Sequence, residues 1–279
     1  MTPDSGYFQH DGLNLHYLRW GEPKCLPIVM LHGLRAYAQT WQSLAAELAE
    51  EFCCYALDQR GRGSSDWGPT GSYHTEVYVR DLKALVDHLN LERFILIGHS
   101  LGGTNALEFA RQYPERVAAL VIEDIGPGSS NRGEGSERIR REMRNTPLVF
   151  SDWEEAENFW RKGRPNLTAE GVRSRLQYSM REDEQGGIVW KHDQSGIAEA
   201  RLTITPTDLW PAVESMNCPT LLVRGGQSDF LPQETVNQVM QCNANFQAVE
   251  ISGASHYVHD DCPEAFNRAV TSFVREQLQ

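Results

Sequence analysis

Short apolar segments alternate with stretches of helical periodicity along most of this 279-residue chain. Six of these segments predict strands, and they lie at residues 27–31, 53–57, 94–97, 117–122, 220–223 and 246–251. The most apolar of them are continuous runs, as expected of strands buried on both faces of a parallel sheet. Helical spacing is clearest at Leu82, Leu85, Val86 and Leu89. This alternation predicts right-handed crossovers and a doubly wound, mostly parallel sheet.

Two further strands are expected at the start of the chain. Residues 8–10 and 13–20 flank Asp11-Gly12, which is a favourable two-residue hairpin turn. The hairpin brings the predicted sheet to eight strands. Adjacent Cys53 and Cys54 fall within one strand, so we expect their side chains to point to opposite faces.

The alternation stops at Gly126 and resumes near residue 206. Residues 127–205 carry no run of buried strands, only charged, helix-like stretches with scattered aromatic residues. We therefore predict a helical cap at 127–205, inserted into a core made of residues 1–126 and 206–279. We interpret its arginines as a solvated helix face and its aromatic residues as cap core. These are Arg132, Arg138, Arg140, Arg141 and Arg144, and Trp153, Phe159, Trp160, Tyr178 and Trp190.

Composition narrows the classes of function. Apolar residues make up 40% of the chain, enough for a substantial core, and the formal net charge of −12 disfavours binding to nucleic acid or anionic lipid. Residues 1–9 lack the apolar run of a signal peptide, and no segment approaches the roughly 20 apolar residues of a membrane helix. The six cysteines show no metal-binding spacing, which favours reduced thiols and a cytoplasmic location. We expect a soluble protein that acts on a small molecule without a metal or cofactor; the sequence does not indicate its oligomeric state.

The strongest chemical signal is Gly98-x-Ser100-x-Gly102, which lies between a predicted buried strand and a predicted helix from about Thr104 to Tyr113. In that context the motif predicts a tight turn that lifts the Ser100 hydroxyl above the sheet. The flanking glycines allow strand and helix to approach closely without Cβ clashes. Ser100 is therefore the candidate nucleophile.

A serine hydroxyl needs a general base at neutral pH. His256 directly follows the last predicted strand, at the sheet edge that would face Ser100, and it is the candidate base. His259 is the nearest rival. His259, Asp260 and Asp261 are residue types that bind metals, but the segment lacks a metal-binding helical motif, and we interpret these three as surface polar residues.

A tetrahedral oxyanion intermediate needs two hydrogen-bond donors. The backbone N–H of Leu101, directly after the candidate nucleophile, would supply one of them. His32-Gly33-Leu34 ends a buried strand, and the N–H of Leu34 is the expected second donor. Gly33 would permit the backbone turn that aims it.

Taken in order, these motifs resemble those of the α/β-hydrolase family with a helical cap. The matching pieces are His32-Gly33, Asp58-x-x-Gly61-x-Gly63-x-Ser65, Gly98 to Gly103, and Gly253-Ala254-Ser255-His256 followed by Pro263-Glu264. The resemblance covers nearly the whole chain and is weakest across 127–205. It implies the α/β-hydrolase fold, with an eight-stranded sheet, and a triad in the order Ser…Asp…His.

The resemblance leaves two candidates for the triad acid. In many relatives the acid follows the seventh strand, but the aligned position here is Ser228, with Asp229 one residue further on. In another group the acid follows the sixth strand, where this chain has Asp124. We favour Asp124, with Asp229 as the alternative. The acid would hold the His256 tautomer and stabilise the imidazolium.

We therefore expect a serine hydrolase that cleaves a carboxylic ester, thioester or lactone through an acyl-enzyme on Ser100. Amide or carbon–carbon bond hydrolysis and perhydrolase activity use the same machinery. A slow-turnover ligand receptor on the same fold is the alternative from another class. Arg35, next to the predicted oxyanion loop, could meet an acidic group of the substrate, but we interpret it as a surface arginine.

Overall fold

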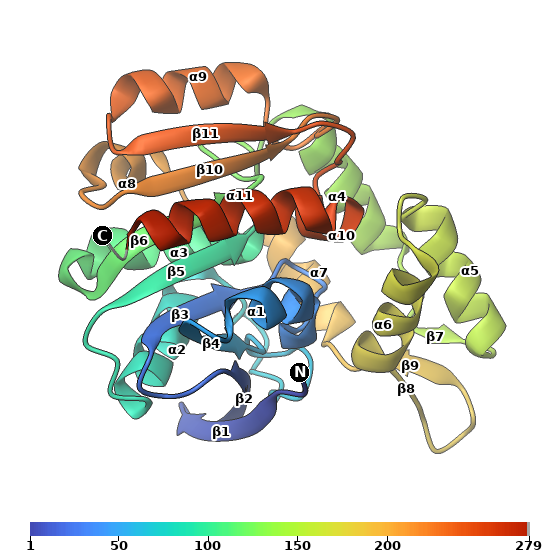
Figure 1. Ribbon diagram of the computed structural model, residues 1–279. Helices are drawn as coiled ribbons and strands as arrows, with labels where there is room; N and C mark the ends of the chain where they lie inside the picture. The colour runs from blue at the N-terminus through green and yellow to red at the C-terminus, as the bar shows by residue number, and fades with distance from the viewer. Residues whose placement is uncertain (278–279) are drawn as a thin grey trace.

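The computed structural model describes residues 1–277, and its centre is an eight-stranded sheet in the order β1-β2-β4-β3-β5-β6-β10-β11 (Figure 1). The strands are β1 Asp4–His10, β2 Leu13–Trp20, β3 Leu26–Leu31, β4 Phe52–Leu57, β5 Phe94–His99, β6 Val117–Glu123, β10 Thr220–Gly225 and β11 Phe246–Ile251. β2 pairs antiparallel with β1 and β4, and the remaining neighbours are parallel. This arrangement confirms the predicted α/β-hydrolase fold.

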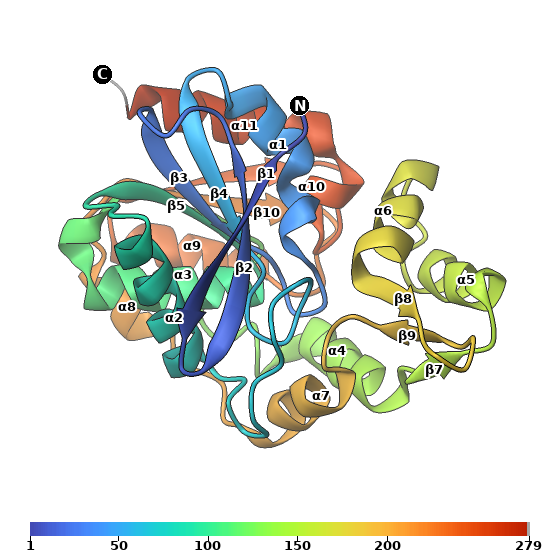
Figure 2. The ribbon, with the colours of Figure 1, turned by 90° about the horizontal axis from the view of Figure 1, so that it is seen from below.

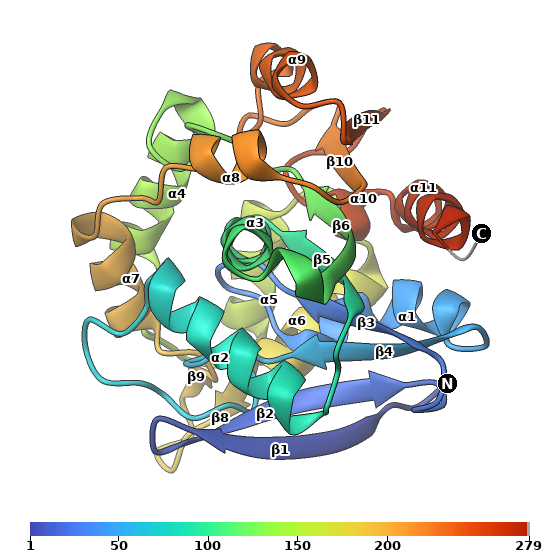
Figure 3. The same cartoon turned by 90° about the vertical axis from the view of Figure 1, so that its left-hand side faces the viewer.

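Helices cover both faces of the sheet (Figure 3). One face packs against α2 Thr75–His88, α3 Leu101–Gln112, α8 Trp210–Ser215 and α9 Gln233–Cys242. The other packs against α1 Gln42–Leu48 and α11 Pro263–Glu276, near the short helices η1 Ala38–Trp41 and α10 Val258–Asp261; η2 Pro114–Arg116 follows α3. Cys53 and Cys54 belong to the two opposite core clusters, because successive strand residues face opposite sides. Within residues 1–277, no helix has the length and apolar character needed to span a membrane.

The segment between β6 and β10, here called the insertion (residues 127–205), lies beside the carboxyl ends of the parallel strands (Figures 1 and 2). It contains α4 Gly133–Asn145, β7 Val149–Phe150, α5 Trp153–Gly163, α6 Ala169–Ser179, β8 Met180–Glu182, β9 Ile188–Trp190 and α7 Gln194–Thr203.

The sequence predicted a helical insertion, but the structure shows that it also contains strands. β7, β9 and β8 form a small antiparallel sheet. Strands of two or three residues are too short to show an alternating pattern, so sequence periodicity does not reveal them. Phe150, Trp160 and Trp190 pack in a separate hydrophobic cluster with this sheet, so several of the scattered aromatic residues do form a local core.

Candidate active site

Ser100 occupies a strained turn between β5 and α3. Its backbone has φ 51° and ψ −112°, a region that residues with a Cβ rarely adopt. The glycines around it are required by close packing. A Cβ on Gly102 would lie 2.1 Å from the carbonyl oxygen of Leu31, and one on Gly98 would lie 2.4 Å from that of Gly102. The helix therefore starts at Leu101, three residues earlier than expected, because these glycines serve close contact and do not interrupt the helix.

The three candidate triad residues come together from separate segments. His256, in the loop after β11, lies with Nε2 3.0 Å from the Ser100 hydroxyl oxygen. Its Nδ1 lies 2.8 Å from Oδ2 of Asp124, which follows β6. All three side chains are buried. This arrangement allows the Ser100 hydroxyl to donate to the imidazole, and the imidazole N–H on the other side to donate to the carboxylate.

The two aspartates that the sequence left open have different surroundings. The backbone N–H of Gly225 donates to Oδ1 of Asp124 at 2.9 Å, and the hydroxyl of Ser228 donates to Oδ2. Ser228 therefore supports Asp124 from the position after the seventh strand. Asp229 accepts two bonds from Arg138, at 2.7 and 2.9 Å. The structure thus brings Asp124, and not Asp229, to His256.

Burial sets the electrostatics of this site. It lowers the pKa of His256 to about 3, so the imidazole is neutral at pH 7 and Nε2 can accept a proton. Burial also raises the pKa of Asp124, while the donors on Ser228 and Gly225 act in the opposite direction. Three donors around one carboxylate, counting the imidazole, favour its ionised form.

His99, which precedes Ser100, has a supporting role that the sequence did not indicate. Its Nε2 lies 3.0 Å from the carbonyl oxygen of His256, so this ring nitrogen donates and holds the His256 backbone. A Cβ on Gly33 would lie 2.6 Å from His99 Nδ1, which explains the glycine at that position. Burial lowers the pKa of His99 to about 3, so the ring stays neutral. The one sequence feature that could have pointed to this role is the position of His99 directly before Ser100 in the Gly98-His99-Ser100 motif.

Leu34 and Leu101 line the same cavity as Ser100. Within residues 1–277, neither backbone N–H has a protein acceptor, so both are free to bind an oxyanion. Arg62, on the loop after β4, donates from Nε to the carbonyl oxygen of Leu34 at 2.9 Å. This bond restrains the peptide that follows Leu34 and steadies the loop.

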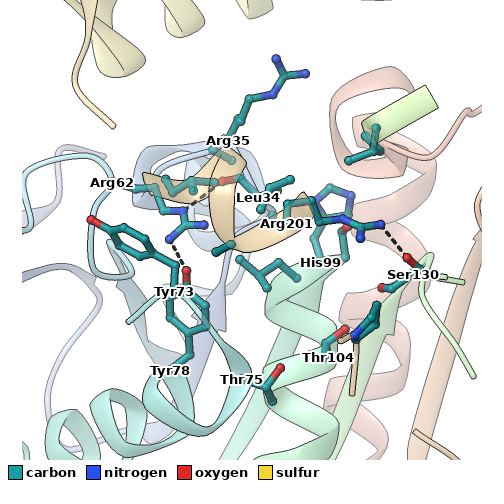
Figure 4. A pocket seen from close by; sticks show the side chains of 18 of the residues that line it. Leu34, Arg35, Arg62, Tyr73, Thr75, Tyr78, His99, Thr104, Ser130 and Arg201 are labelled. Carbon is teal, nitrogen blue, oxygen red and sulfur yellow. Dashed lines mark hydrogen bonds between the residues drawn. The ribbon is translucent and has the colours of Figure 1, made fainter. Parts of the chain in front are cut away.

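The cavity has a volume of about 280 Å³, enough for a small molecule. The core contributes Ser100, His256 and the loop at Leu34, and the insertion contributes residues such as Trp160 and Arg201. Figure 4 shows part of this lining, with Arg62 and Tyr78 on one wall and Arg201 and Ser130 on another.

Two interpretations of charged residues were wrong. Arg35 is not a surface residue, because it is largely buried, lines the cavity and forms an ion pair with Glu142 of α4. His259 is also buried, with Nδ1 2.8 Å from Glu123 and Nε2 2.8 Å from the hydroxyl of Thr40.

The acids beside His259 have structural partners. Asp260 accepts bonds from Arg164 and Arg175 of the insertion, and Asp261 accepts from the backbone and hydroxyl of Ser255. These contacts need tertiary neighbours that the local sequence does not reveal. No cluster of three potential metal ligands occurs in the described part of the chain.

Comparison with known proteins identifies the family of this chain. The model of a family described as "alpha/beta hydrolase fold" matches residues 27–185, more than half of the chain. A 2-(acetamidomethylene)succinate hydrolase of Mesorhizobium japonicum is 28% identical over 247 residues, covering 88% of this chain and 87% of that protein. An esterase of Mycobacterium tuberculosis is 27% identical over 257 residues, covering 89% and 82%. The crystal structure of an E-2-(acetamidomethylene)succinate hydrolase has a TM-score of 0.88 at 26% identity and covers 98% of this chain and 99% of that one. The chain therefore belongs to the alpha/beta hydrolase family and is a hydrolase.

Proposed function

We propose that this hydrolase cleaves a carboxylic ester, thioester or lactone of a small molecule through an acyl-enzyme on Ser100. The observation that carries the proposal is the continuous hydrogen-bonded series from Ser100 through His256 to Asp124 at the cavity wall. A neutral imidazole between a hydroxyl and a buried carboxylate is the arrangement that activates a serine for acyl transfer.

In the first half-reaction, His256 Nε2 takes the hydroxyl proton as Ser100 Oγ forms a bond to the carbonyl carbon. The carbonyl oxygen becomes an oxyanion, which the N–H groups of Leu34 and Leu101 would stabilise. The intermediate then expels the alcohol, thiol or ring oxygen, which receives the proton from the imidazolium. In the second half-reaction, water gives its proton to His256 and attacks the acyl carbon. Collapse of that intermediate releases the acid and returns the proton to Ser100.

We also propose that the insertion acts as a cap over the reacting groups. Trp160, Ile197 and Arg201 line the cavity, together with the core residues Ser100 and His256. An insertion placed in this way limits the access of bulk water to the acyl-enzyme and makes substrate choice depend on the insertion.

The test uses short p-nitrophenyl esters and a fluorophosphonate probe. We expect wild-type protein to turn over at least one ester many times and to be labelled at Ser100, and we expect Ser100→Ala to lose both properties while its thermal unfolding stays unchanged. Unchanged turnover by Ser100→Ala would refute the proposal. Labelling without turnover of any ester, thioester or lactone would favour a ligand receptor, and turnover of amides alone would favour an amidase.

A further inference from the structure

The cavity beside Ser100 is rich in cations, although the whole chain has a formal net charge of −12. Five arginines line it, namely Arg35, Arg62, Arg164, Arg175 and Arg201. Arg35 pairs with Glu142, and Arg164 and Arg175 share Asp260. These three arginines therefore have carboxylate partners within the protein. The remaining two are Arg62 and Arg201, and neither has a carboxylate partner among residues 1–277.

Arg201 of α7 is half-buried, and it donates two hydrogen bonds, both from Nη2. It donates to the carbonyl oxygen of Ser130 at 2.6 Å and to the hydroxyl of Ser136 at 3.3 Å. Over residues 1–277, no carboxylate lies within ion-pair distance of it, and its Nε and Nη1 have no protein acceptor. Burial, followed by the charge of Arg140, lowers the pKa of Arg201 to about 10, so the group remains cationic at pH 7.

Arg62 is the second cation without a counter-charge. Its side chain is fully buried, and it donates to the carbonyl oxygens of Leu34 and Arg60 and to the hydroxyl of Tyr78. Its Nη2 has no partner in the described structure, and no described carboxylate lies within ion-pair distance. Figure 4 shows Arg62 and Arg201 among the residues around one cavity.

A buried guanidinium without a carboxylate is unfavourable, because desolvation is not offset by an opposite charge. Two such groups around one cavity favour the binding of an anion, because its charge would offset the cost of desolvating them. Arg62 is inaccessible and acts through its field, whereas Arg201 exposes donors that a ligand can reach. The lining contains a single acidic residue among those described, Glu76, and it is exposed to solvent.

We propose that the substrate carries a carboxylate, separate from the scissile bond, which Arg201 binds from the insertion side of the cavity. This inference rests on the proposed ester-type hydrolysis and specifies its substrate class, for example a monoester of a dicarboxylic acid. A planar guanidinium matches the two oxygens of a carboxylate and gives hydrogen bonds stronger than those to a neutral amide.

The first experiment compares substrates that differ only in this charge. Monomethyl succinate, glutarate and adipate are tested against the methyl esters of the matching monoamide acids, with methanol release as the assay. At the best chain length, we expect kcat/KM for the carboxylate to exceed that for the carboxamide by roughly 10- to 100-fold. Equal kcat/KM values at all three lengths would overturn the inference.

Variants then assign the preference to Arg201. Arg201→Gln should bring the carboxylate-to-carboxamide ratio of kcat/KM close to one, and Arg201→Lys should restore part of it. Arg141→Gln, an exposed arginine of α4, is the matched control and should keep the wild-type ratio. A wild-type ratio in folded Arg201→Gln would refute the role of Arg201. If that variant does not fold, the test is competitive inhibition: glutarate but not glutaramide should inhibit wild type, and this difference should be smaller in Arg201→Lys. An undiminished difference in Arg201→Lys would refute the role of Arg201.

Binding to Ser100→Ala separates this inference from the proposed function. Calorimetry with monomethyl glutarate and the methyl ester of glutaramic acid needs no turnover, and preferential binding of the carboxylate would support the anion site even if no ester is cleaved. Conversely, Ser100-dependent turnover without any preference for charge would leave the proposed function intact and remove the inference.

Discussion

Asp124→Asn tests the choice between the two candidate triad acids. The asparagine can keep the bond from the Gly225 N–H only if its carbonyl oxygen takes the place of Oδ1. Its amide nitrogen then takes the place of Oδ2, 2.8 Å from His256 Nδ1. This amide donates, so Nδ1 must become the acceptor and the ring proton must move to Nε2. The imidazole then faces Ser100 with a donor and can no longer accept the hydroxyl proton.

Two losses therefore combine in Asp124→Asn: the imidazole adopts the wrong tautomer, and no carboxylate remains to stabilise the imidazolium in the transition state. Loss of this function in a serine triad lowers kcat by roughly 10⁴-fold, which corresponds to about 5 kcal/mol of transition-state stabilisation. Because the amide has the shape of the carboxylate, we expect the fold to persist.

The assay measures kcat on a p-nitrophenyl ester together with thermal unfolding. Asp229→Asn is the matched control, since it makes the same chemical change at the other candidate acid, whose carboxylate pairs with Arg138 and not with His256. Both side chains of that pair are partly exposed, at 25% and 31%, so its loss should destabilise the fold by about 0–1 kcal/mol. We expect kcat of the control to change less than roughly tenfold. A larger loss in Asp229→Asn than in Asp124→Asn would refute the assignment.

Three further predictions follow from the site. Because burial lowers the pKa of His256, the acid limb of kcat/KM for a neutral ester should lie below pH 6.5, and a limb at or above that value would contradict the neutral buried imidazole. Gly102→Ala should be destabilised by roughly 1–3 kcal/mol or fail to fold, because its Cβ would overlap the carbonyl of Leu31; wild-type denaturant unfolding would argue against this close contact. Arg62→Met should lower kcat more than it raises KM, since the bond that steadies the Leu34 carbonyl is lost, whereas a change in KM alone would contradict that role.

Local patterns in the sequence were sufficient for the sheet and for two members of the site. Continuous apolar runs identified the central strands because a strand covered on both faces has no polar alternation. Gly98 and Gly102 on either side of Ser100 indicated the tight turn, because the backbone at these two glycines leaves no room for a Cβ. His256 could be selected by its place after the last strand, since parallel strands end at the same edge of the sheet.

Long-range contacts decided the remainder. Asp124 and Asp229 were both reasonable acids in the sequence. Tertiary contacts distinguish them: Asp124 meets His256 and accepts bonds from Gly225 and Ser228, whereas Asp229 pairs with Arg138. The uncompensated charge of Arg201 was equally invisible, because a missing ion-pair partner can be recognised only when all neighbours are in place. Sequence periodicity reports which face of an element is buried, whereas pairing of charges across the cavity depends on how distant segments meet.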